Sequence, residues 1–141
     1  MKYLSVLTLA FTLFTSSFVL APSNEDKGID FKDISFEEAL ALAEKENKLV
    51  FLDAYAVWCG PCKMMDRTTF KSEKVGRLFN KSFINIKIDM EKGEGPALAR
   101  KYQVTAYPTF FVLNPDGKMV KRIIGYMGED QLIGQVQEFV N

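Results

Sequence analysis

The feature that most constrains this chain is an apolar run over residues 49–56 (LVFLDAYA) that leads into two closely spaced cysteines, Cys59 and Cys62. A short, nearly continuous apolar run predicts a strand buried on both faces, at the centre of a sheet with helices on each side. Asp53 is the one charged residue in this run. A strand that ends at Cys-Gly-Pro-Cys therefore sets both the expected fold and the expected chemistry.

The remaining elements follow from local patterns. Ser35 and Glu38 form a capping box, with apolar residues at helical spacing behind them. Residues 83–89 alternate between apolar and polar, and the turn 114–117 (NPDG) joins two further strands. The predicted strands cover 49–56, 83–89, 109–113 and 119–124. The predicted helices cover 35–47, 72–80, 96–102 and 130–140, and one more helix starts at the cysteine pair and is ended by residues 68–70 (TTF). This order predicts an α/β fold: a mixed β-sheet flanked by helices on both faces, a closing β-hairpin and a C-terminal helix.

The Cys59-Gly60-Pro61-Cys62 sequence suits thiol–disulfide exchange. Cys59 falls at the start of a helix, where unpaired backbone N–H groups and the helix dipole favour a thiolate. Gly60 and Pro61 allow a tight entry into that helix. In such a pair Cys59 attacks a substrate disulfide, and Cys62 resolves the mixed disulfide. The alternative is a short structural disulfide or two unused thiols.

Composition excludes several other classes of site. The chain has 141 residues, no His and two Cys, so it holds no Ser-His-Asp triad, no Cys-His pair and no imidazole metal ligand. Two cysteines do not complete a structural zinc site, which needs four Cys or His ligands. The 18 basic and 18 acidic residues balance, which argues against a nucleic-acid partner. We therefore expect no metal and no cofactor beyond the cysteine pair.

The N-terminus has the pattern of a secretory signal peptide. Residues 1–21 combine Lys2, an apolar stretch and small residues near the end. An uncleaved membrane anchor is the alternative, although six hydroxyl side chains weaken the stretch as a membrane span. We expect residues 22–32 to be a flexible leader and residues 33–141 to be the folded domain. This organisation places the protein in the periplasm or the secreted space.

Several motifs together resemble the thioredoxin family. Residues 58–63 (WCGPCK) match its active-site motif, Asp53 matches its buried acid, residues 107–109 (YPT) match its cis-proline loop, and Gly125 matches the glycine after its last strand. The likeness spans roughly residues 33–140. Residues 52–56 (LDAYA) and 69–70 (TF) look most like secreted thioredoxin-like proteins and the C-terminal domain of bacterial membrane thiol:disulfide interchange proteins.

The resemblance implies roles for single residues. Cys59 would be the nucleophile, Cys62 the resolving thiol, and Asp53 the proton acceptor for Cys62, with a structural acid as the alternative role of Asp53. Pro108 would form a cis peptide bond, and the backbone of Ala106 and Tyr107 would bind the substrate chain as an added strand. Substrate contacts are also expected from Trp58, Gly60 and Pro61, with simple core packing as the alternative for Trp58. Met127 is expected to fill apolar space, with substrate contact as its alternative role.

One position departs from the family. The lysine that neighbours the buried acid in thioredoxins would fall at Asn85, while Lys87 lies two residues further on the same strand face. Lys87 is therefore a candidate substitute. The leading hypothesis is a monomeric reductase of protein disulfides, re-reduced by a membrane electron donor. An oxidase or isomerase, or a non-catalytic binding or chaperone module, remain the alternatives.

Overall fold

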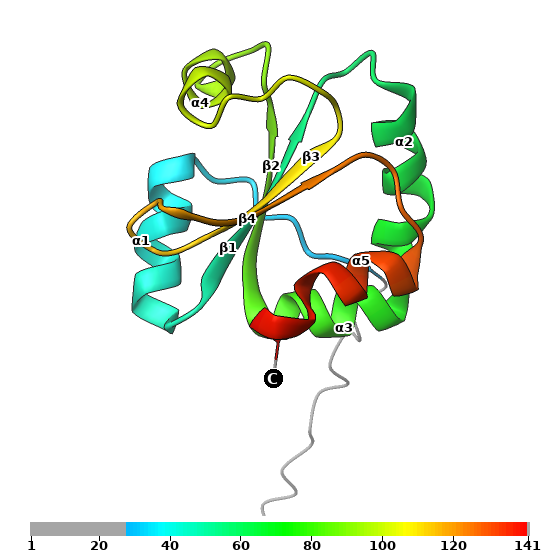
Figure 1. The fold of residues 1–141 in the computed structure, drawn as a ribbon. Coiled ribbons are helices and arrows are strands. Elements are labelled where there is room, and N and C mark those ends of the chain that lie inside the picture. Colours follow the sequence, from blue (N-terminus) through cyan, green and yellow to red (C-terminus); the bar gives the residue numbers. More distant parts are fainter. Residues whose placement is uncertain (1–27, 141) are drawn as a thin grey trace, which may run out of the picture.

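The structure, a computed structural model, describes residues 28–140, so the predicted signal peptide 1–21 and residues 22–27 of the leader lie outside it. A four-stranded sheet with the order β2-β1-β3-β4 forms its centre (Figure 1). β1 is parallel to β2 and antiparallel to β3, and β3 is antiparallel to β4, which confirms the mixed sheet and the closing hairpin. The strands are β1 Leu49–Tyr55, β2 Phe83–Asp89, β3 Thr109–Leu113 and β4 Met119–Ile124.

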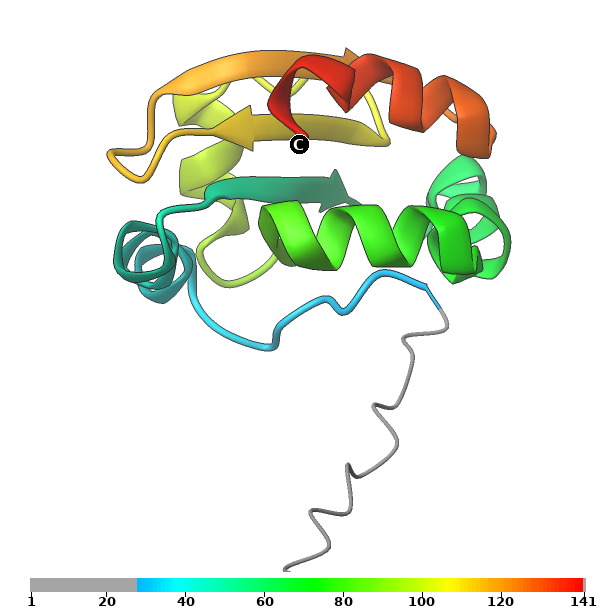
Figure 2. The same cartoon turned by 90° about the horizontal axis from the view of Figure 1, so that it is seen from below.

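Helices cover both faces of this sheet, as predicted. Figure 2 shows α3 and α5 together in front of one face, and α1 and α4 contribute to the apolar core of the other. The helices are α1 Phe36–Glu46, α2 Gly60–Arg67, α3 Glu73–Ser82, α4 Gly95–Lys101 and α5 Glu129–Val136, with 3₁₀ turns at η1 Thr69–Lys71 and η2 Gln137–Phe139. Within residues 28–140, no helix is long and apolar enough to cross a membrane.

One predicted helix end agrees with the structure and another differs from it. The helix that follows Cys59 stops at Arg67, and Thr68, the first of the three residues predicted to end it, has a non-helical backbone. The Thr68 hydroxyl donates a hydrogen bond to the Met64 carbonyl at 2.7 Å, a local bond that competes with regular helix. The C-terminal helix ends at Val136 and tightens into a 3₁₀ turn, so the predicted helix over 130–140 is too long.

The period-two alternation of the strands separates two apolar cores. Ile84, Ile86 and Ile88 of β2 face α1 and α4, as their spacing predicts. Phe51 of β1 faces the other way and packs edge-to-face on Phe79 of α3, with ring centroids 4.8 Å apart. Asp53 lies two residues after Phe51, so its carboxylate points into the core on the side of α2, α3 and α5.

The segment before α1 packs against the domain from residue 28 onward. The Ile29 N–H donates to the Phe70 carbonyl at 2.8 Å, and the Phe31 ring lies edge-on to the Phe70 ring at 5.1 Å. Gly28 has a positive φ of 100° and lies directly against Gly76 of α3, so a Cβ on either glycine would collide with backbone. Residues 28–32, which we predicted to belong to a flexible leader, are thus hydrogen-bonded parts of the packed domain.

Candidate active site

β1 and α2 bring the two cysteines to one end of the sheet. Cys59 is the N-cap of α2 and forms a disulfide with Cys62, with the two Cα atoms 5.3 Å apart. The Cys62 N–H donates to the Cys59 sulfur at 3.2 Å, so the sulfur receives one of the unpaired amides of the helix N-terminus. Pro61 occupies the first turn, where a missing N–H costs nothing. The predicted strand-to-helix setting of Cys59 is confirmed.

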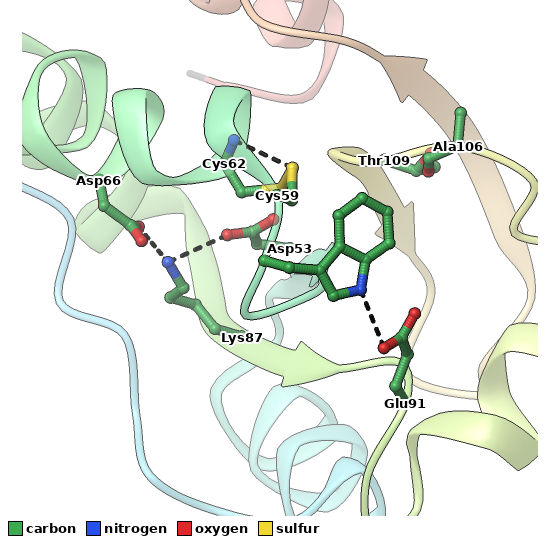
Figure 3. The surroundings of a disulfide bond; sticks show 9 residues. Asp53, Cys59, Cys62, Asp66, Lys87, Glu91, Ala106 and Thr109 are labelled. Atoms are coloured by element: carbon green, nitrogen blue, oxygen red, sulfur yellow. Dashed lines mark hydrogen bonds and ion pairs between the residues drawn. A yellow bond between two sulfur atoms is a disulfide. The ribbon is translucent and has the colours of Figure 1, made fainter.

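Asp53 lies beneath this pair and is 1 % exposed. Its Oδ2 is 3.2 Å from the Lys87 Nζ, while its Oδ1 has no hydrogen-bond partner among residues 28–140. In Figure 3 the carboxylate lies between the disulfide and the Lys87 ammonium. Burial raises the pKa of Asp53 to about 6, and the nearby Lys87 charge only partly offsets that rise. A buried carboxyl with a pKa near neutrality is suited to accept and return a proton.

Lys87, rather than the Asn85 position of the thioredoxin pattern, supplies the cation for Asp53. The register of the parallel strands sets Lys87 directly opposite Asp53 and sets Asn85 opposite Phe51. The Lys87 Nζ also forms an ion pair with Asp66 of α2 (Figure 3). Burial opposes the charge on Lys87, but attraction to Asp53 and Asp66 outweighs burial, and the pKa of Lys87 is raised.

Three aromatic rings surround the Lys87 ammonium. Its Nζ lies 5.2 Å from the Phe31 ring centroid, 5.1 Å from that of Tyr55 and 5.4 Å from that of Phe70. These ring faces stabilise a partly desolvated cation. Residues of β1, β2, α2, η1 and the segment before α1 therefore surround the ion pair between Asp53 and Lys87.

The cis-proline loop has the predicted form. The Tyr107–Pro108 peptide bond is cis, Pro108 is buried, Tyr107 is half-buried and Ala106 is exposed. The Ala106 carbonyl accepts a hydrogen bond from the Thr109 hydroxyl at 2.7 Å. The Ala106 oxygen therefore already accepts one hydrogen bond within the loop. Binding of a substrate strand by the backbone of Ala106 and Tyr107 stays a prediction.

Trp58 lies on the surface beside the motif, where the resemblance placed it. Its side chain is 65 % exposed, so the alternative role as a core residue is wrong. The indole Nε1 donates to the Glu91 carboxylate at 3.0 Å (Figure 3). The Trp58 ring packs edge-to-face on the Tyr107 ring, with ring centroids 5.7 Å apart. Gly60 and Pro61 are also exposed beside the disulfide. Substrate contact by these residues stays a prediction.

Sequence reasoning missed Glu91 and Asp66. Asp66 lies one helical turn after Cys62, and that i to i+4 spacing was the available sign that its side chain shares the face of the motif. Nothing in the sequence marks Glu91 as a partner of Trp58. A cavity elsewhere, lined in part by Lys48, Ser82 and Pro115, contains none of the predicted site residues.

Comparisons with known proteins agree with this geometry. Residues 36–139 match the family described as a thioredoxin-like domain. A thioredoxin-like protein of Synechocystis is 41 % identical over 106 residues, which are 75 % of this chain and 92 % of that protein. Chloroplastic thioredoxin Y2 of Arabidopsis thaliana is 37 % identical over 103 residues, 73 % of this chain, and the match spans only 56 % of that relative's length.

Solved structures give the same assignment. A candidate disulphide isomerase from Bacteroides thetaiotaomicron has a TM-score of 0.70 and 46 % identity, covering 79 % of this chain and 92 % of that one. The oxidised C-terminal domain of Neisseria meningitidis DsbD has a TM-score of 0.63 and 27 % identity, covering 79 % and 98 %. The chain belongs to the thioredoxin-like family, and its Cys59–Cys62 pair makes it a protein-disulfide oxidoreductase.

Proposed function

We propose that the protein reduces disulfides of other proteins in the periplasm or the secreted space. The observation that carries the proposal is that Cys59, at the N-terminus of α2, lies above a buried Asp53, one oxygen of which has no hydrogen-bond partner within the described part of the chain. The first group forms a reactive thiolate, and the second takes up the proton that the resolving step releases.

The reaction balances with two electrons and two protons. The Cys59 thiolate attacks one sulfur of the client disulfide, the client S–S bond breaks, and one client sulfur leaves as a thiolate. Asp53 removes the proton of Cys62, whose sulfur then attacks the Cys59 sulfur. This second step forms the Cys59–Cys62 disulfide, breaks the bond between Cys59 and the client, and releases the other client sulfur as a thiolate. One client thiolate regains its proton from Asp53, and the other takes from water the proton that Cys59 gave up when it ionised. The client gains two electrons, and an external reductant must restore the cysteine pair.

The reductive direction is supported by the Gly60-Pro61 dipeptide and by likeness to thioredoxins, one of them the Thermus thermophilus thioredoxin at 25 % identity and a TM-score of 0.70. The likeness to a candidate disulphide isomerase favours a second candidate function, isomerisation or oxidation. A reduction potential of about −270 mV would support the reductase, and one of about −120 mV would support the oxidase.

The proposed location and the proposed electron donor both depend on the predicted signal peptide, residues 1–21. Residues 1–21 have the signal-peptide pattern, and a compartment outside the cytoplasm supplies no ready thiol reductant, so we propose a membrane electron donor. Relatives named chloroplastic work elsewhere, so the proposed location depends on this segment alone. Fractionation of cells that express the full chain, with the mass of the exported product, tests it; retention in the cytoplasm would overturn it.

An insulin-reduction assay separates the enzyme from a non-catalytic module. The reduced wild-type protein should reduce insulin, and Cys59→Ser should abolish that activity. An inactive wild-type protein would favour the binding or chaperone module.

Cys62→Ser should stall at the mixed disulfide, so mass spectrometry of trapped species from the native cell identifies the clients. A size measurement on the same sample tests the proposed monomer.

A further inference from the structure

The loop that joins β4 to α5, residues 125–128, connects the two halves of the active-site surface. Its Gly125 N–H donates to the Pro108 carbonyl at 2.9 Å, which ties the loop to the cis-proline loop. In Figure 1 the same loop then descends beside α2, the helix that carries the cysteine pair. One short segment thus spans from one wall of the site to the other.

Side chains of α2 and η1 hold both backbone polar groups of Met127. Its N–H donates to the Met65 sulfur at 3.5 Å, and its carbonyl accepts a hydrogen bond from the Thr69 hydroxyl at 2.8 Å. All three residues are buried, with Met65 at 0 %, Thr69 at 2 % and Met127 at 9 % exposure. Because a buried backbone group needs a partner, these two side chains fix the position of the loop.

Tyr126 lies between the two anchors and faces solvent. It is 46 % exposed, whereas its neighbour Met127 turns into the core beside Leu132. The neighbouring Ile124 is also exposed, at 56 %. An exposed aromatic residue on an anchored backbone is the kind of side chain that contributes most to protein contacts, because little freedom is lost when a partner covers it.

We propose that Thr69 is a positioning residue for client recognition. Its hydroxyl, with the Met65 sulfur, fixes Met127 so that Tyr126 stands as a rigid aromatic wall against a polypeptide lying across the Cys59–Cys62 pair. The client this surface fits is an extended segment with an apolar side chain next to its disulfide. The inference rests on the proposed reduction of protein disulfides and assigns the buried Thr69 a function beyond packing.

The test compares a protein disulfide with a small one. Insulin is large enough to contact Tyr126, whereas 2-hydroxyethyl disulfide reaches only the sulfur atoms. We measure kcat/KM for each with Thr69→Val, which keeps the shape and loses the donor. The selectivity for insulin over the small disulfide should fall about three- to tenfold through a higher KM, because the loop must now be ordered on binding. Thr69→Ser retains a hydroxyl and should restore selectivity.

The adjacent threonine provides a matched control. The Thr68 hydroxyl bonds to Met64 within its own helix, so Thr68→Val makes the same chemical change without touching the loop, and its selectivity should equal that of the wild type. An equal fall of kcat/KM toward both substrates in Thr69→Val would show that Thr69 supports the cysteine pair instead. Wild-type kcat/KM toward both substrates would show that the anchor is irrelevant. Either result overturns the proposal.

Tyr126→Ala keeps the test decisive if Thr69→Val does not fold. This variant leaves both anchors in place and removes only the exposed ring, so its selectivity for insulin should also fall. Wild-type selectivity in Tyr126→Ala would refute the client wall. Failure of the wild-type protein to reduce even the small disulfide would instead refute the proposed function, so the two failures are distinguishable.

Discussion

Two opposing effects act on the pKa of the Asp53 carboxyl. Its position in the central strand removes it from water and disfavours its charge, while Lys87 at 3.2 Å favours that charge. Burial is the larger effect, so the pKa of Asp53 rises to about 6. The site therefore gains a base for neutral pH at some cost to the stability of the fold.

Asp53→Asn should stabilise the folded protein at neutral pH. Below the ordinary pKa of about 4, the carboxyl is protonated in both the folded and the unfolded state, so the variant gains nothing there. As the pH rises from about 4 to about 6, only the unfolded state loses its proton, and wild-type stability falls. Urea unfolding at pH 7 should therefore show a gain of about 1–3 kcal/mol in the variant. The exposed Asp33→Asn is the control.

Asp53→Asn should also have a lower kcat than the wild type near neutral pH. The kcat of the wild type for insulin should rise with pH through about 6, as Asp53 ionises and becomes able to accept the Cys62 proton. Asp53→Asn should lack this rise and approach the wild type only at alkaline pH, where the thiol ionises unaided. An unchanged pH profile would leave Asp53 a structural acid.

At the scale of elements, the pairing of β1 with β2 decides which lysine serves the acid. The strand bounds could be predicted closely, because alternation, turn residues and apolar runs are local: the predicted 83–89, 109–113 and 119–124 coincide with β2, β3 and β4. Register depends on contacts between distant segments, so the choice between Asn85 and Lys87 remained open until β2 was aligned with β1.

Lys87→Met should move the pH dependence upward. Loss of the ammonium removes the main charge that favours ionised Asp53, so the pKa of Asp53 rises further. The rise of kcat with pH should shift by about one unit or more toward alkaline pH. Lys45→Met, on the exposed last turn of α1, should leave the profile in place. An unchanged pH profile in Lys87→Met would show that the ion pair with Lys87 does not set the pKa of Asp53.

At the scale of the whole molecule, the packed domain includes residues 28–32, which the sequence places in the leader. The polar composition of residues 22–32 predicts a flexible leader, because it gives no sign of the partners that residues 28–30 have on α3 and η1. The Asn80 side chain accepts from the Asp30 N–H at 2.8 Å and donates to the Gly28 carbonyl at 3.1 Å. Side-chain bonds to backbone across 50 and 52 residues leave no periodic pattern to detect. The hydrogen bond from the Thr69 hydroxyl to the Met127 carbonyl, across 58 residues, likewise leaves no pattern in the sequence.

Phe31→Ala tests this segment. The ring packs on Phe70 and lies beside the Lys87 ammonium, so its loss should lower the free energy of unfolding by about 1–3 kcal/mol. Urea unfolding measures the change, with the exposed Asp33→Ala as control. Equal stability of the two variants would mean that the segment contributes little to the folded domain.

The contact between Gly28 and Gly76 has a consequence for how this sequence can vary. A Cβ on Gly76 would lie 2.2 Å from the Gly28 carbonyl oxygen, and a Cβ on Gly28 would lie 2.2 Å from the Phe70 carbonyl oxygen. A side chain gained at either position displaces the segment that carries Phe31 toward Lys87. Descendants of this chain that keep this backbone path should therefore keep both glycines. A lineage that replaces Gly76 needs a new path for the segment around Gly28 and a new aromatic neighbour for its half-buried Lys87.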